Sequence, residues 1–527
     1  MPIRMVDDDP NQIDRDENDN SSADTGGSNK GRGGIGIGNL LMFIPLIFGA
    51  FGKFPKLTLF ILLLLGFMYF KGCSMLGTDD NSTSFVGDQP GRGATLDPKE
   101  FDKAEVFEPL DPTKTPLPER VSLERFAPTR LDQGQQGSCV GWGSAYAART
   151  ILESASTGQN PNEIAFSPSF LYNQISLAGC QGSYINRAME VLTRRGCLPL
   201  KDFGYNQNDC DRQPDGQQIQ RASQYVMRGY NRLTPTDDPR GIDMMAIKQN
   251  LVAGAPVVIG MNVTKSFTQD MMGQKLWKAS SSDYAGNNSL GGHCMCVIGY
   301  DDNFAGGAFQ IMNSWSSRWG ENGIAWVSYR DFEHFTQEAY GLYPMPKKGD
   351  MASKKFACEI GLADVQNKRY VPLTVANGNL FKTIQPITKG TRFKIEIKNN
   401  TECYTYIFGE ESDKSSYILF PYSKKHSPFC GITGYRLFPR YQSLQADQIG
   451  NKDQMAIVVT KQPIDFNKLN AAINSSRQNT YQAKVNEALG NAGIQNVRFN
   501  SNKGIIQFES LTQDSQAVAM IVEIDKY

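Results

Sequence analysis

The chain has no excess of charge of either sign. Lys and Arg together number 54, Asp and Glu together also number 54, and the 527 residues carry no formal net charge. Domains that bind nucleic acid cluster basic side chains against the phosphates, and a balanced chain offers no such surplus. The charge balance therefore predicts no nucleic-acid partner.

Histidine is scarce, and the usual metal-binding patterns are missing. The three histidines are His293, His334 and His426, and the sequence contains no His-Glu-x-x-His and no Cys-x-x-Cys. Zinc sites draw their ligands from such patterns. We therefore expect no metal centre and no cofactor, and we interpret His334 and His426 as surface or structural residues.

Long apolar runs are absent except between residues 39 and 77, where two blocks, 40–52 and 57–70, flank a short basic segment. A helix over 57–70 covers about 21 Å of a hydrocarbon core about 30 Å thick, so it must extend to residue 77 to span a membrane. We interpret the second block as one spanning helix and the first as an interfacial segment. Residues 39–77 are thus expected to anchor the chain to a membrane.

The basic residues around this region predict its orientation. After Lys71 the next basic residue is Arg92, whereas Lys30, Arg32, Lys53 and Lys56 all precede the span. Because basic residues favour the cytoplasmic side, we expect the N-terminus in the cytoplasm and the chain after residue 78 on the far side. A helical hairpin made of both blocks is the alternative, and it would return the chain to the cytoplasm.

Composition divides the rest of the chain. Residues 1–38 are acidic and then Gly-rich and are expected to be disordered, and residues 78–116 are rich in Asp, Pro, Gly and Thr and are expected to form a flexible linker. A globular region follows over 117–346, then a connector over 347–386 and a β-rich region with a helical segment over 387–527.

Periodicity within the globular region predicts an α+β fold. Helical spacing comes first and strand-like segments follow, at 140–156 and 185–196 for the helices and at 255–263, 293–302, 308–315 and 324–330 for the strands. Helices that precede the strands favour two segregated halves over alternating βαβ units.

Side chains in this region can supply the chemistry of a cysteine peptidase, which needs a thiolate, a histidine, a group that orients the histidine, and donors for the oxyanion. Cys139 lies where a loop enters a predicted helix, and a helix N-terminus lowers the pKa of a thiol below its free value of about 8.5. His293 opens a predicted strand, and the Asn313 amide can hold its ring. Trp315 can keep water away from that hydrogen bond.

The segments around these residues resemble the papain family of cysteine peptidases. "DQGQQGSC" resembles the family's approach to the nucleophile, "GGHCMCVIGYDD" its histidine strand and "NSWSSRWGENG" its asparagine segment. With "LPERVSLERF" and "AYGLYPM" at the ends, the resemblance covers 117–346. It implies a papain-like fold with a helical half and a β-barrel-like half. It also implies that Gln133 is an oxyanion donor and that Gly182 and Ser183 lie beside the substrate backbone.

The sequence departs from the family at several positions. Val140 stands where a Trp usually follows the nucleophile, and this "CVGW" form resembles bacterial members. With the predicted orientation, it places the protein in a bacterial inner membrane with a periplasmic catalytic domain. Gln136 stands where many members carry a disulfide Cys, so Cys180 lacks its usual partner, and Cys197, Cys210 or no partner remain the alternatives.

The residues ahead of the globular region do not resemble an inhibitory pro-region. Residues 78–116 are too few and too unpatterned to form the long helical pro-region found in cathepsins. We therefore expect an enzyme that is either constitutively assembled or controlled from outside this domain.

The C-terminal part over 387–466 resembles a bacterial β-domain of unknown function called DUF4384, through "GTRFKIEIKNN", "CYTYIF" and "YILFPY". The resemblance implies a β-sandwich-like docking module for a protein partner, with no chemistry of its own. Cys403 and Cys430 fall on neighbouring strands of this module, and we expect them to form a disulfide if the compartment is oxidising.

These features predict a membrane-anchored cysteine endopeptidase that hydrolyses peptide or protein substrates through Cys139, His293, Asn313 and Gln133. One alternative is an envelope protein whose papain-like fold binds peptide without cutting it. Another is a transpeptidase that passes the same acyl-enzyme to an amine, because hydrolysis and transfer share these residues.

Overall fold

The structure is a computed structural model that describes residues 3–8, 91–233, 241–346, 355–490, 497–510 and 517–527. The membrane-anchoring region expected over 39–77 lies outside these residues. Among the helices described, none is long and apolar enough to cross a membrane.

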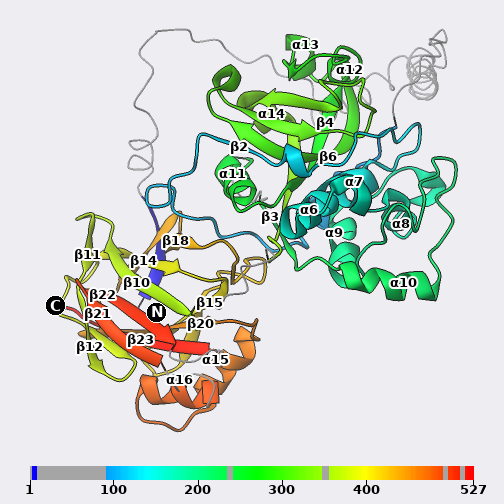
Figure 1. The fold of residues 1–527 in the computed structure, drawn as a ribbon. Helices are drawn as coiled ribbons and strands as arrows, with labels where there is room; N and C mark the ends of the chain where they lie inside the picture. Colours follow the sequence, from blue (N-terminus) through cyan, green and yellow to red (C-terminus); the bar gives the residue numbers. More distant parts are fainter. Residues whose placement is uncertain (1–2, 9–90, 234–240, 347–354, 491–496, 511–516) are drawn as a thin grey trace, which may run out of the picture. The chain divides into compact units, whose positions relative to one another are not determined.

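The first half of the globular region is helical, as the sequence predicts (Figure 1). Its central helix runs without a break from Cys139 to Thr157, with a π-helical middle in which every residue is buried. Small residues such as Gly143 and Ala145 let this middle part lie deep in the core. The helices of this half are α5 (Cys139–Gly141), the π-helix η4 (Trp142–Arg149), α6 (Thr150–Thr157), α7 (Pro161–Ile164), α8 (Pro168–Tyr172), α9 (Ile185–Arg194) and α10 (Gly216–Ala222).

The second half is a mostly antiparallel sheet in the order β3-β9-β4-β6-β7-β8-β5, with β2 paired to β6. Its strands are β2 (Arg120–Ser122), β3 (Tyr230–Arg232), β4 (Val257–Thr264), β5 (Leu276–Trp277), β6 (Ser289–Asp301), β7 (Ala308–Met312), β8 (Ile324–Ser328) and β9 (Thr336–Leu342). Its helices are α11 (Met244–Val252), α12 (Lys265–Gln269), α13 (Ser281–Tyr284) and α14 (Tyr329–Phe335). Helices first and sheet afterwards confirm the predicted α+β fold.

Short 3₁₀ turns complete this region at η3 (Glu124–Phe126), η5 (Ala178–Cys180), η6 (Ser223–Tyr225) and η7 (Phe304–Gly306). Two strand boundaries near the predicted site differ from the prediction. The strand predicted over 293–302 begins at Ser289, so His293 lies inside it rather than at its start, and the strand predicted over 308–315 ends early. β7 ends at Met312, so Asn313 and Trp315 lie in the turn that follows, where the backbone N–H of Asn313 donates to Gly323 O rather than to the ladder.

The C-terminal region is β-rich, as predicted, and contains two sheets. One follows the order β1-β19-β14-β10-β22-β21, and the other the order β12-β13-β23-β20-β15-β16. The first comprises β1 (Ile3–Asp7), β10 (Ala357–Asp364), β11 (Arg369–Val371), β14 (Arg392–Asn399), β18 (Gly434–Phe438), β19 (Gln442–Ala446), β21 (Val497–Asn502) and β22 (Ile505–Ser510). The second comprises β12 (Leu373–Asn377), β13 (Leu380–Thr383), β15 (Cys403–Glu410), β16 (Ser416–Phe420), β17 (Phe429–Cys430), β20 (Lys452–Thr460) and β23 (Ala517–Asp525).

Side chains alternate between the two faces of these strands, and the apolar ones form two clusters. Ile395 of the first sheet and Ile457 of the second belong to a shared cluster. On the second sheet the alternate side chains, such as Val458, pack with two helices, α15 (Phe466–Ser475) and α16 (Tyr481–Leu489). These helices confirm the predicted helical segment, and α16 lies against β20 and β23 (Figure 1).

Three of the predicted boundaries are wrong. Within the expected disordered stretch 1–38, Ile3–Asp7 form β1, which pairs with β19 and buries Ile3 completely. Within the expected connector 347–386, residues from Ala357 onward already form strands of both sheets. Short strands with few apolar residues acquire their burial from partners that are distant in the sequence, which local composition does not reveal.

The third wrong boundary is the flexible linker expected over 78–116. From residue 91 it is ordered against the folded regions, with a short helix α4 (Pro98–Phe101) that Asp97 caps. Its scattered apolar side chains Phe101, Phe107 and Leu110 are each at most 8% exposed. They follow no periodicity, which is why the segment was expected to be flexible.

The burial of Ile3 gives a test of the first sheet. Ile3→Ala removes a side chain with no exposed surface and is expected to lower the free energy of unfolding by about 3 kcal/mol. Met5→Ala, at a position 37% exposed on the same strand, is expected to cost under about 0.5 kcal/mol. Urea unfolding of the two variants beside the wild type measures the difference. Equal effects of the two substitutions would contradict the placement of β1.

Candidate active site

The fold brings the predicted catalytic residues together from three elements. Cys139 is the first residue of the central helix, His293 lies in β6, and Asn313 follows the end of β7. The sulfur of Cys139 accepts a hydrogen bond from the backbone N–H of Cys294, the residue after His293, at 3.4 Å. The helix N-terminus therefore meets β6 at the position of the histidine.

The histidine ring is held on one edge and covered on one face. His293 Nε2 lies 2.8 Å from Asn313 Oδ1. The ring of Trp315 stacks on His293 with 4.2 Å between centroids and an interplanar angle of 21°. Because Asn313 holds Nε2, the other ring nitrogen, Nδ1, is the one left for the thiol, and it makes no hydrogen bond within the described residues. The structure thus places Asn313 and Trp315 around His293 as the sequence predicts.

Gln133 is fixed by a network that the sequence did not reveal. Its side-chain oxygen accepts a hydrogen bond from Ser314 Oγ at 2.6 Å, and its Nε2 donates to Gln136 O at 2.9 Å. Its carbonyl oxygen accepts from the Tyr205 hydroxyl at 2.7 Å, and that hydroxyl also lies 2.8 Å from Ser138 Oγ. Ser314 and Tyr205 therefore position Gln133 beside the loop that leads to Cys139.

A further segment, residues 91–96, lies over these residues, and we refer to it as the strap. Trp315 Nε1 donates a hydrogen bond to Gly91 O at 3.1 Å, and Ala94 N–H donates to Gly292 O at 3.2 Å. Cys139, His293 and Gln133 have no exposed surface. No local sequence feature indicates this contact, because "PGRGATL" has the composition of a linker and its partners are more than 35 positions away.

Burial changes the protonation of the catalytic pair. It raises the pKa of the Cys139 thiol to about 11, although four backbone N–H groups act in the opposite direction. It lowers the pKa of His293 to about 4, against the hydrogen bond that the ring makes to Asn313 Oδ1 and with help from the positive charge of Arg92. The expectation that the helix N-terminus lowers the pKa of Cys139 is therefore wrong for this covered state, in which burial outweighs the helix. Near pH 7 both groups are neutral here.

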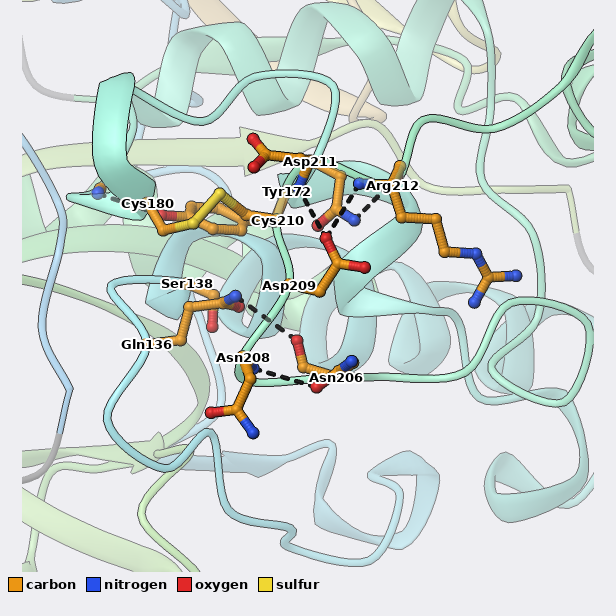
Figure 2. Close-up of a disulfide and its surroundings, with 12 residues drawn as sticks. Gln136, Ser138, Tyr172, Cys180, Asn206, Asn208, Asp209, Cys210, Asp211 and Arg212 are labelled. Atoms are coloured by element: carbon orange, nitrogen blue, oxygen red, sulfur yellow. Dashed lines mark hydrogen bonds between the residues drawn. A yellow bond between two sulfur atoms is a disulfide. The ribbon is translucent and has the colours of Figure 1, made fainter.

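The residues expected beside the substrate backbone, Gly182 and Ser183, lie in a loop that a disulfide ties down. Cys180 and Cys210 form this disulfide, with Cα atoms 5.9 Å apart, which decides between the alternatives for Cys180 (Figure 2). Gly182 N–H donates to the Tyr172 hydroxyl at 3.1 Å, and Ser183 Oγ donates to Ile175 O at 2.8 Å. The loop is thereby fixed beside Cys139.

The disulfide also connects to the loop before the nucleophile. Gln136, which stands in place of the usual half-cystine, donates from Nε2 to Asn206 O at 3.4 Å, near Cys210 (Figure 2). A side-chain hydrogen bond thus joins the loop before the nucleophile to the loop that carries Cys210.

The other cysteines of the described residues are free and buried. Cys403 and Cys430 face each other on β15 and β17 but remain thiols, so the expected disulfide between them is not formed. Cys403 also lies beside Cys358, so three thiols share this part of the core. Cys294 and Cys296 are core thiols, as expected.

His334 and His426 lie apart from the site. The His334 ring packs on Tyr284 and Phe335, and His426 Nδ1 lies 3.1 Å from Ser423 Oγ in the C-terminal region. No cluster of His, Cys, Asp and Glu within the described ranges could hold a metal ion.

Comparisons with known proteins match the globular region to one family. Residues 122–345 match the papain family cysteine proteases. A peptidase C1-like protein of Acanthamoeba polyphaga mimivirus is 28% identical over 211 residues, which are 38% of this chain and 65% of that protein. A cysteine protease of Blomia tropicalis is 27% identical over 232 residues, which are 42% of this chain and 64% of that protein.

Among solved structures, xylellain, a cysteine protease from Xylella fastidiosa, is 23% identical and superimposes with a TM-score of 0.42, over 50% of this chain and 100% of that one. The chain spans less than two thirds of the length of the two relatives named above. Residues 122–345 form a papain-family cysteine peptidase domain.

The lowered pKa of His293 predicts a pH-dependent stability. The unfolded chain binds a proton on this residue below about pH 6.5, whereas the folded protein does so only below about 4. Neutral His293 therefore makes its full contribution to the free energy of unfolding above pH 6.5. This contribution is lost as the pH falls toward 4, at up to about 1.4 kcal/mol per pH unit.

Urea unfolding at pH 7 and pH 4.5 measures this effect. His293→Gln stays neutral at both pH values, so the wild type is expected to lose more stability on acidification than this variant. Parallel losses in the two proteins would show that His293 titrates normally in the fold.

Proposed function

We propose that the protein is a cysteine endopeptidase that hydrolyses peptide or protein substrates. The observation that carries the proposal is the His293 ring held by Asn313 Oδ1 at 2.8 Å and stacked on Trp315 at 4.2 Å, next to Cys139 at a helix N-terminus. A histidine fixed by one nitrogen offers the other to a nucleophile.

The proposed reaction proceeds through an acyl-enzyme. His293 Nδ1 takes the thiol proton, and the Cys139 thiolate attacks the peptide carbonyl carbon. The backbone N–H of Cys139 and the second N–H of the Gln133 amide stabilise the oxyanion. His293 then gives its proton to the leaving amine, and water, deprotonated by the same ring, releases the acid and restores the thiol.

Two alternatives share parts of this site. A catalytically silent peptide-binding protein has no need for Cys139, His293, Asn313 and Gln133 in one hydrogen-bonded arrangement, which favours the enzyme. A transpeptidase needs the same four residues and an amine in place of water. Product analysis with an added amine separates it from a peptidase.

Substitution of Gln133 tests the enzyme. Gln133→Ala removes one oxyanion donor and is expected to lower kcat by about 10²- to 10³-fold. Cys139→Ala is expected to abolish turnover. Cleavage of a fluorogenic peptide library measures the rates, and circular dichroism checks that the variants fold. Near-normal turnover by Gln133→Ala would contradict the role of Gln133, and turnover by Cys139→Ala would contradict the mechanism.

We further propose that residues 39–77 anchor the protein to a bacterial inner membrane as a hairpin of the two apolar blocks. β1, which precedes this segment, pairs with β19, which follows it. One sheet cannot lie on both sides of a membrane, so the chain must cross an even number of times. This pairing favours the hairpin over the single crossing that the basic residues indicate.

The disulfide supports a periplasmic position for the folded part. Disulfides persist in oxidising compartments, and Cys180–Cys210 lies in the peptidase domain. In this arrangement the N-terminus is periplasmic too, and the short turn with Lys53 and Lys56 faces the cytoplasm. The C-terminal region, proposed to be DUF4384-like, would then meet its protein partner in the periplasm.

Labelling of introduced cysteines tests the topology. Met5→Cys and Tyr527→Cys, at positions 37% and 72% exposed, are placed separately in a Cys73→Ser background. Both are expected to react with a membrane-impermeant maleimide on spheroplasts. Reaction of Tyr527→Cys alone would indicate a single crossing and contradict the hairpin. Reaction of either only after lysis would contradict the periplasmic position.

A further inference from the structure

A lysine and two aspartates meet inside the C-terminal region, at one end of its two sheets. Lys526 Nζ donates to Asp453 Oδ1 at 2.6 Å and also donates to Asp447 Oδ1. The side chains of Lys526 and Asp453 have no exposed surface, and that of Asp447 is 9% exposed. One amine and two carboxyl groups are therefore enclosed together.

Lys526 and Asp453 stand at positions where the strand pattern calls for apolar side chains. Asp453 of β20 pairs directly with Ile524 of β23, and Lys526 comes two residues after Ile524. Lys526 is therefore the diagonal neighbour of Asp453 on the same face of the sheet. On that face Met455 and Val522 belong to the apolar cluster that the two sheets share. The amine and the carboxyl thus point into the space between the sheets.

Backbone contacts fix both partners. The N–H of Lys526 donates to Asn451 O at 2.9 Å, and Lys526 also forms a parallel bridge with Ile387. The Asp453 carboxyl accepts a hydrogen bond from the backbone N–H of Asp447. The strands themselves therefore hold the amine against the carboxyl. Fixed contact of this kind gives two groups a very high effective concentration toward each other.

The surroundings favour the uncharged forms of the pair. Burial raises the pKa of Asp453 to about 6, against the hydrogen bond and the charge of Lys526. The Oδ2 atoms of Asp447 and Asp453 are buried without a hydrogen-bond partner among the described residues, so the group is not a fully satisfied ion pair. A proton that passes from Lys526 to Asp453 leaves a neutral amine, which is a nucleophile, beside a neutral carboxylic acid.

We propose that Lys526 and Asp453 join in an intramolecular amide bond that the folded chain forms by itself. The inference concerns the C-terminal region and does not depend on the proposed peptidase activity. It gives this region a chemistry of its own, whereas the sequence predicts a docking module with none.

The proposed step is a condensation in which nothing is oxidised or reduced. The Lys526 amine attacks Cγ of the protonated Asp453 carboxyl, and the Asp447 carboxylate takes the proton that the nitrogen loses. Asp447 then gives this proton to the hydroxyl group that leaves Asp453. A C–N bond forms, a C–O bond breaks and one water molecule departs. Asp447 ends as it began, so it acts as a proton shuttle.

The bond ties the end of β23 to β20 and closes the segment that carries α15 and α16 into a covalent loop. A closed loop has fewer unfolded conformations than an open one, so the bond opposes unfolding of the second sheet. The amide also replaces a buried charged group by a neutral one, which removes the cost of enclosing those charges.

Mass spectrometry of the full chain tests the proposal. With its disulfide reduced, the intact wild type is expected to weigh one water molecule less than the sum for its sequence. Lys526→Arg keeps the positive charge, but its guanidinium does not attack a carboxyl, so this variant is expected to show the full mass of its sequence. Lys452→Arg is the matched control, because Lys452 contacts Glu523 and Asp525 at the same strand end and is 56% exposed. This control is expected to lack one water molecule, like the wild type.

Digestion with trypsin identifies the linked residues. Trypsin cleaves after Lys and Arg, so the two aspartates fall in separate peptides, 453–461 and 441–452. Lys526 falls in peptide 504–527, because the amide blocks cleavage after it. A branched peptide that joins 504–527 to 453–461 is expected. A branch to 441–452 would overturn the assignment of Asp453 as the acceptor.

Asp447→Ala tests the proton shuttle. It leaves Lys526 and Asp453 in contact and is expected to slow the loss of water by about a hundredfold or more, measured as intact mass at intervals after a pulse of synthesis. Loss of water at the wild-type rate would overturn the role of Asp447. A wild-type chain of full mass would overturn the whole proposal and leave an ordinary buried ion pair. Because that result needs no variant, a variant that fails to fold does not weaken the test.

Discussion

The register of β6 against β7 is the constraint on which the active site depends. Cys296 faces Met312 at the end of this antiparallel pair, so His293, three residues earlier in β6, lies beside the turn that carries Asn313 and Trp315. That is where the two rings stack. Asn313 follows directly on the last paired residue, so its amide reaches the edge of the same imidazole. A slip of one residue would turn His293 to the other face of the sheet and separate all three side chains.

The strap adds a second constraint, because it removes water from a site that must carry charge to react. An ion pair between Cys139 and His293 needs solvent or fixed dipoles around both partners. With the strap in place the thiol has a pKa of about 11 and the imidazole a pKa of about 4, so the neutral pair is favoured. Arg92 of the strap brings a positive charge toward His293 and opposes the imidazolium further. The strap therefore both covers Cys139 and His293 and disfavours their charged forms.

The sequence allowed a prediction where a reactive residue stands inside a short segment with a recognisable pattern. Cys139, His293 and Asn313 are each surrounded by neighbours in sequence that help to build the site, so the catalytic residues could be predicted. The periodicity of the helices and strands predicted the α+β fold. The strap and β1 could not, because Gly93 and Ile3 owe their positions to partners that are far away in the chain. Neither segment has a long hydrophobic periodicity or a long apolar run that would indicate burial. Cysteine pairing was undetermined for the same reason, since spacing carries no information about which loops meet.

The covalent connection explains how such a short strap can cover the site. A segment tethered a few residues from its binding position acts at an effective concentration on the order of millimolar, so weak contacts suffice to keep it bound. A free peptide must compete against that concentration as well as against the hydrogen bonds to Ser183. Because Asp102 binds both Arg232 and Lys425, the tether between this point and the strap is only a few residues long.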